Sequence, residues 1–148
     1  MIIAPTAIII INIVFLFLLT CIEKEGMAKK LNINKVVHVV ENVDWVIRWI
    51  GETIQKNLES ESFEFKIEES SFFVTDSIVH FGSLHTVFRE AWVTRERSNR
   101  SLVTVFHGNK DIDEYFSKAI DNFLKIQNSV DRVIVSNSIM RERMISWG

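Results

Sequence analysis

Apolar and polar residues follow two different periods along the chain. Lys35–Glu41 and Asp76–Phe81 are short, largely apolar runs, which is typical of parallel strands buried on both faces. Phe63–Glu68 alternates apolar and polar residues and so predicts a strand with one face in water. Leu102–Phe106 and Arg132–Val135 are two further apolar runs that predict strands.

Helical periodicity fills the segments between these strands. Val43–Leu58, Leu84–Arg97 and a segment that starts near Asp111 repeat apolar residues every three or four positions. Asp111 and Glu114 have the spacing of a capping box, which predicts a helix start there. The apolar stripe of that helix comprises Ile112, Tyr115, Phe116, Ala119, Ile120, Phe123 and Leu124. Gly51 lies inside the first helix, where Gly costs about 1 kcal/mol relative to Ala, so we expect a close helix–sheet contact.

A last helix is expected over Ile139–Trp147, with an N-cap from Ser136-Asn137-Ser138. The order of elements is therefore β-α-β-β-α-β-α-β-α. This order predicts an α/β fold, namely a Rossmann-like, doubly wound, mostly parallel sheet with helices on both faces. An apolar N-terminal helix is expected to precede it.

Residues 1–26 form an apolar leader that differs from the rest of the chain. Met1–Ile22 contains 18 apolar residues and no charged side chain. As a helix, residues 6–22 would extend roughly 25 Å, the lower limit for crossing a hydrocarbon layer about 30 Å thick. Three interpretations stay open: a membrane anchor, an untranslated stretch upstream of a start at Met27, and a cleaved secretory signal.

The remaining residues, 27–148, are expected to form one domain. We expect a cytoplasmic chain, either free or anchored through residues 6–22. The formal net charge of −2 means that the chain has no net positive electrostatic field to attract a polyphosphate backbone. A nucleic-acid partner is therefore not expected.

Motifs for metals, disulfides and common cofactors are missing from the sequence. Cys21 is the single cysteine, which excludes a disulfide framework and a cysteine-based zinc site. The four histidines lack the i, i+4 spacing of metal ligands, so no metal is expected. No glycine-rich dinucleotide motif follows the first strand, so no resident cofactor is expected.

Doubly wound sheets bind ligands outside the carboxyl ends of their strands. The candidate ligand-binding residues therefore follow the predicted strands: Asn42, Gly82, Ser83, His85, Gly108, Asn109, Ser136 and Asn137. His107 is the candidate for chemistry, because an imidazole at a strand end can hydrogen-bond a ligand hydroxyl or take up a proton near neutral pH. A capping or packing role is the alternative. His38 and His80 fall within strands and are expected in the core.

Three segments resemble a known family: IVHFGSLH (78–85), LVTVFHGN (102–109) and SVDRVIVSNSIMRERMISWG (129–148). They are similar to the N-terminal, acceptor-side domain of GT-B glycosyltransferases of the retaining family 4 type, and the resemblance covers Lys35–Gly148. It implies transfer of a sugar from a nucleotide-sugar donor to the hydroxyl of a sugar, lipid or other acceptor. By the same resemblance, His107 would lie near the transferred sugar as the catalytic residue, and Gly108 would allow close approach of the backbone.

The sequence departs from this family in two places. Glu41-Asn42-Val43 stands where a glycine pair often follows the first strand. The sequence ends at Gly148, before the family's donor-binding half, so we expect a truncated or split chain that is inactive by itself. The alternatives are a membrane-tethered α/β module that binds a small ligand without catalysis, and a structural subunit that pairs with a separate donor half.

Overall fold

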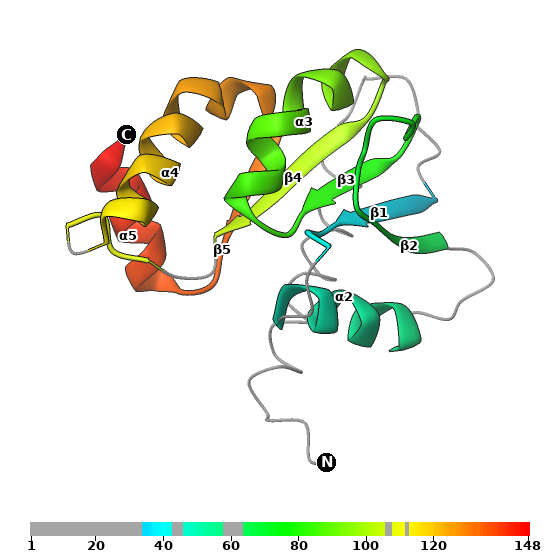
Figure 1. Ribbon diagram of the computed structural model, residues 1–148, viewed down its shortest axis with the longest axis horizontal. Coiled ribbons are helices and arrows are strands. Elements are labelled where there is room, and N and C mark those ends of the chain that lie inside the picture. The colour runs from blue at the N-terminus through cyan, green and yellow to red at the C-terminus, as the bar shows by residue number, and fades with distance from the viewer. Residues whose placement is uncertain (1–33, 43–45, 58–63, 106–107, 112) are drawn as a thin grey trace. The chain divides into compact units, whose positions relative to one another are not determined.

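The computed structural model describes residues 34–42, 46–57, 64–105, 108–111 and 113–148, with the side chains of 92–96 excepted (Figure 1). These residues belong to a compact unit spanning Ile33–Gly148. The strands are β1 (Lys35–Val39), β2 (Glu64–Glu68), β3 (Ile78–Phe81), β4 (Arg100–Val105) and β5 (Arg132–Val135). The helices are α2 (Val46–Asn57), α3 (Leu84–Glu96), α4 (Glu114–Ile126) and α5 (Ser138–Trp147), and a 3₁₀ turn at Gln127–Ser129 follows α4. The predicted order of strands and helices is confirmed.

The five strands form one sheet in the order β2-β1-β3-β4-β5, and every pair in it is parallel. The predicted doubly wound α/β fold is therefore confirmed. The direction of winding reverses between β1 and β3, which are neighbours in the sheet although β2 lies between them in sequence. The central strands are almost wholly buried, whereas β2 alternates buried and exposed residues as predicted for a strand with one wet face.

Helices cover both faces of the sheet, with α2 on one side and α3 and α4 on the other (Figure 1). The face beneath α3 and α4 carries the largest apolar core. Its strand residues are Val37, Val39, Val79, Phe81, Val103 and Val105, and its helix residues are Leu84, Val87, Ala91, Ala119, Ile120, Phe123 and Met140. This core follows from the period of two along each strand, since every second residue points to the same face.

Two helix starts test the predicted caps. Asn137 caps α5 as predicted, because its Oδ1 accepts a hydrogen bond from Met140 N at 2.8 Å. The cap predicted at Asp111 is wrong: Asp113 begins α4, and its Oδ1 accepts from Phe116 N at 3.0 Å. The Asp111 amide instead donates to Asn109 Oδ1 at 3.0 Å, so this residue belongs to a turn before the helix.

The prediction of a membrane anchor falls on residues 1–26, which lie outside the described residues. Among the helices that the structure does describe, none combines the length and apolarity needed to span a bilayer.

Gly51 is explained by a close contact between α2 and the sheet, as expected from the sequence. A Cβ atom at residue 51 would lie 2.5 Å from Cδ2 of the buried His38 ring on β1. Gly82, just after β3, allows the same close approach of α2 to the sheet. A Cβ atom at residue 82 would meet the Ile47 side chain of α2 and lie 3.1 Å from His38 Cε1. Both glycines allow α2 to approach the sheet around one imidazole.

We predict that Gly51→Ala destabilises the fold by about 1 kcal/mol or more, because overpacking against His38 costs about 1–3 kcal/mol and outweighs the gain in helix propensity. Urea unfolding would measure the effect. In a His38→Ala background the same substitution should become neutral or stabilising, since the ring that it strikes is gone. A loss of stability of equal size in both backgrounds would contradict this explanation.

Candidate functional site

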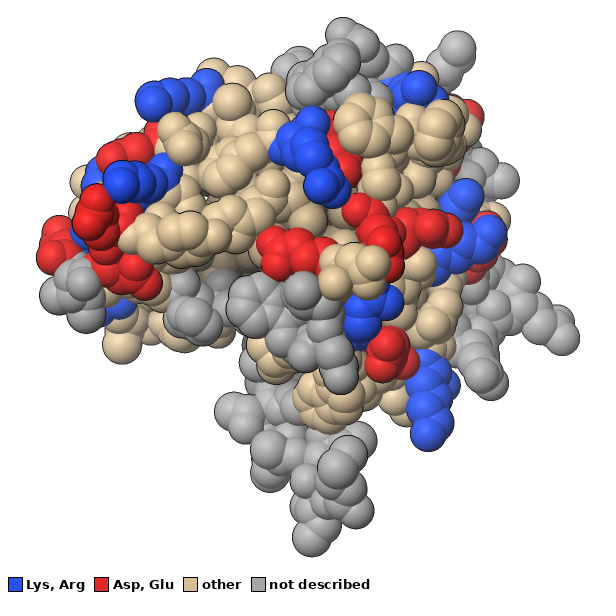
Figure 2. Space-filling view, viewed as in Figure 1, with Lys and Arg blue, Asp and Glu red and all other residues tan. Residues whose placement is uncertain are grey.

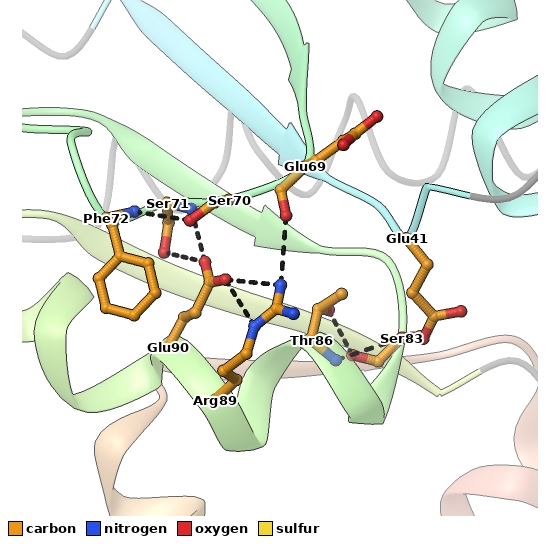
Figure 3. A network of polar contacts seen from close by, with 9 residues as sticks. All are labelled: Glu41, Glu69, Ser70, Ser71, Phe72, Ser83, Thr86, Arg89 and Glu90. Carbon is orange, nitrogen blue, oxygen red and sulfur yellow. Dashed lines mark hydrogen bonds and ion pairs between the residues drawn. The ribbon is translucent and has the colours of Figure 1, made fainter.

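The carboxyl ends of β1 and β3 meet at a carboxylate held by a hydroxyl. Glu41 follows β1, and Ser83 stands between β3 and α3. Ser83 Oγ donates a hydrogen bond to Glu41 Oε1 at 2.9 Å (Figure 3), and the Gly82 amide donates to the Val39 carbonyl at 3.0 Å. This is the point where the winding of the sheet reverses, the usual place for a ligand in such folds.

Ser83 also begins helix α3. Its hydroxyl oxygen lies 3.4 Å from Thr86 N, which donates to it, and Thr86 Oγ1 donates to the Ser83 carbonyl at 2.9 Å. One hydroxyl therefore links the end of β1 to the first turn of α3, and this link fixes the direction of the Glu41 carboxylate.

A second carboxylate, Glu69, lies next to this point at the end of β2. Arg48 of α2 donates through Nη2 to Glu69 Oε1 at 3.2 Å and to the Glu41 carbonyl at 3.4 Å. Neither Arg48 nor Glu69 was selected from the sequence. Glu69 directly follows a predicted strand, and this position could have identified it.

Beneath Glu69, a buried carboxylate fastens the segment after β2 to α3. Glu90 is fully buried and accepts a hydrogen bond from Ser71 Oγ at 2.8 Å. Arg89 forms an ion pair with Glu90 at 2.8 Å and donates to the Glu69 carbonyl at 3.3 Å (Figure 3). These contacts hold the ends of β2 and α3 in one frame and leave Glu90 no access to a ligand.

His38 and His80 lie side by side in the sheet beneath α2. Their Nδ1 atoms are 3.0 Å apart, His80 Nε2 is 2.6 Å from Thr104 Oγ1, and His38 Nε2 is 3.4 Å from the Ile47 carbonyl. A carbonyl can only accept, so His38 Nε2 must donate to it, and a neutral ring then accepts at Nδ1. The hydrogen bonds therefore all have the same direction: Thr104 donates to His80, His80 donates to His38, and His38 donates to the Ile47 carbonyl.

Burial keeps both rings neutral. It lowers the pKa of His38 to about 4, and it lowers the pKa of His80 well below its usual value. The expectation that both histidines belong to the core is confirmed. No group of three or more His, Cys, Asp or Glu side chains in the described part of the chain is placed to hold a metal ion.

The other predicted ligand residues lie along the same edge of the sheet. Asn42 is exposed after β1, next to Glu41. Asn109 is half-buried after β4, and its Oδ1 is used in the turn to Asp111. Ser136 is half-buried after β5, and the neighbouring Asn137 uses its side chain to cap α5.

Gly108 is fixed by contacts with two helices of the domain, α4 and α5. Its φ of +145° is a conformation that side chains rarely adopt, and a Cβ atom would strike the Phe116 ring of α4. The Gly108 carbonyl accepts a hydrogen bond from Arg143 Nη1 of α5 at 2.9 Å. The contacts that this segment makes with α4 and α5 therefore explain why residue 108 is a glycine. His107, the residue expected to carry chemistry, lies outside the described residues.

His85 is exposed on the first turn of α3, and Tyr115 of α4 lies against it with 5.1 Å between ring centroids. Tyr115 is 69% exposed, so its prediction as part of the apolar stripe is wrong. The reason is that Phe116 supplies the inward aromatic ring at this level of α4, packing 6.0 Å from Trp147 of α5.

No protein-family model, curated protein or solved structure matches this chain. The residues themselves therefore decide what the carboxyl edge can bind. Figure 2 shows Lys and Arg interspersed with Asp and Glu on the visible face, without a continuous basic field among the coloured residues. At the switch point the arginines are engaged by Glu69 and Glu90, so a neutral, hydroxyl-bearing ligand fits this edge better than an anionic one.

We predict that stability falls with acidification because the buried imidazoles must become charged. The folded-state pKa of His38 is about 4 and its unfolded value is near 6.5, so the unfolded chain binds the extra proton first as pH falls. The free energy of unfolding should be constant above about pH 7 and lower by about 2 kcal/mol at pH 5 from His38 alone.

Urea unfolding between pH 7.5 and 5 checks this pH dependence. His38→Asn should make the dependence shallower without abolishing it, because burial also lowers the pKa of His80. Phe73→Ala, which changes an exposed ring without an ionisable group, should leave the dependence as in the parent protein. Equal slopes in the parent chain and His38→Asn would show that His38 does not cause the dependence.

Proposed function

We propose that the domain is the acceptor-side domain of a glycosyltransferase, which binds the molecule whose hydroxyl receives a sugar from a nucleotide-sugar donor. The observation that carries the proposal is the position of the three family-like segments. Residues 78–85, 102–109 and 129–148 include β3, residues 102–105 of β4, and β5 with α5, and these three strands are parallel. Their strand ends therefore share the edge at which doubly wound folds bind ligands.

The groups at this edge suit recognition of a hydroxyl. Glu41 is an acceptor-only carboxylate that Ser83 already orients, and a carboxylate of this kind can accept a further hydrogen bond from a ligand hydroxyl. Such a contact fixes the position of the acceptor oxygen, and positioning accounts for a large share of the rate in bimolecular transfer. His107 is the residue to which the resemblance assigns the place beside the transferred sugar.

A second candidate function is a binding module that recognises a small hydroxyl-bearing ligand without catalysis. The observation that favours it is the packing around Gly108, since its glycine character is explained by Phe116 and Arg143 without any ligand. The two functions share one site and differ in whether a sugar is transferred there.

We predict that Ser83→Ala, tested in the polypeptide or complex that carries the proposed transferase activity, raises the acceptor KM about tenfold, because Glu41 loses the partner that directs it. The donor KM should be unchanged. His107→Ala should lower kcat, measured with both the donor and the acceptor at saturating concentration. Initial rates of radiolabelled sugar transfer would measure these constants.

The matched control is Glu52→Gln, which changes an exposed carboxylate on the outer surface of α2 and should leave all constants unchanged. Acceptor kinetics that do not respond to Ser83→Ala would contradict the proposed site. A ligand that binds at this edge, with no transfer from any nucleotide sugar, would establish the binding module instead.

A further inference from the structure

Two exposed aromatic rings stand together at the carboxyl edge of the sheet. His85 lies on the first turn of α3 and Tyr115 on the first turn of α4. Their ring planes are inclined by 31° with centroids 5.1 Å apart, and Phe88 meets His85 edge-on at 6.3 Å. The apolar core does not require Tyr115, because the ring is 69% exposed.

The pair continues the row that begins at the switch point. Ser83 binds Glu41 and starts α3, His85 is two residues further along the chain, and Tyr115 is in contact with His85. Passing from β1 towards α4, the edge therefore presents a carboxylate, a hydroxyl, an imidazole and a phenol ring. Hydrogen-bonding groups lie at one end of the row and aromatic surface at the other.

This sequence of groups matches the surface of a sugar ring. A pyranose has a face of C–H bonds that packs on an aromatic ring, and a rim of hydroxyls that need hydrogen-bond acceptors and donors. A nucleotide would also stack on the rings but would need cations for its phosphates. The cations nearest the pair along the chain are engaged: Arg89 binds Glu90, Lys110 binds Asp121 and Lys118 binds Glu114.

We propose that His85 and Tyr115 form the stacking platform for the terminal sugar ring of a saccharide acceptor. This inference rests on the proposed function and narrows it, because it selects a saccharide from the possible acceptors. The Tyr115 ring supplies the stacking surface, and Glu41 and Ser83 receive the hydroxyls at the rim of the sugar.

Saturation-transfer NMR on the intact chain with maltose, lactose, chitobiose and α1,2-mannobiose tests the platform. At least one of these disaccharides should bind. Tyr115→Ala should weaken that binding about tenfold and Tyr115→Phe less than about twofold, since stacking needs the ring and not the phenol oxygen. Phe73→Ala removes another exposed ring, 91% exposed and located in the segment between β2 and β3 next to Val74, whose carbonyl is bound by Asn99, and should leave the affinity unchanged. Thermal unfolding of each variant would confirm that the fold is retained.

The outcomes separate this inference from the function on which it rests. Equal binding by the parent chain and Tyr115→Ala would overturn the platform, and so would the failure of all four disaccharides to bind. Sugar transfer to a non-saccharide hydroxyl would also overturn it while leaving the glycosyltransferase intact. Binding that depends on Tyr115, with no transfer by the native polypeptide, would retain the platform and overturn the proposed transferase.

Discussion

The pairing of β1 with β3 is the contact on which the rest of the structure depends. It places His38 beside His80 at the centre of the sheet, where a hydrogen bond between the two rings satisfies one buried nitrogen of each. Because His38 also contacts Gly51 and Gly82, it sets the distance between α2 and the sheet. The same pairing brings Glu41 and Ser83 within hydrogen-bond distance at the strand ends. Core packing and candidate site are therefore consequences of one strand pair.

Polar groups in this domain have two distinct roles. Those under the helices form closed networks: Thr104, His80 and His38 form one, and the buried pair Ser71 and Glu90, which the exposed Arg89 joins through an ion pair, forms the other. Buried polar groups are costly unless every member is satisfied, so these networks fix the fold. The groups at the carboxyl edge are partly exposed, which leaves them accessible to a ligand. The structural histidines, His38 and His80, are buried, whereas His85 is exposed.

The fold was largely predictable because its determinants are local. The apolar runs of β1 and β3 and the stripe of α4 lie in continuous segments, and the cap at Asn137 is read from adjacent residues. The cap at Asp113 was not predicted because Asp111 and Asp113 both offer a capping carboxylate, and only the turn that holds Asp111 against Asn109 shows that the helix starts two residues later. The site was only partly predictable. Ser83 and Asn42 follow from strand ends, whereas Arg48, Glu69 and the exposure of Tyr115 depend on how helices pack, which periodicity does not determine.

We propose above all that this domain binds its ligand at the carboxyl edge of the sheet, where the winding reverses. Backbone amide shifts of isotope-labelled chain, recorded during titration with the four disaccharides, test it most directly. We expect the largest shifts in residues 41–42, 82–86 and 113–116. Shifts centred on the opposite edge, around Ser77, Asn99 and Asp131, would contradict it.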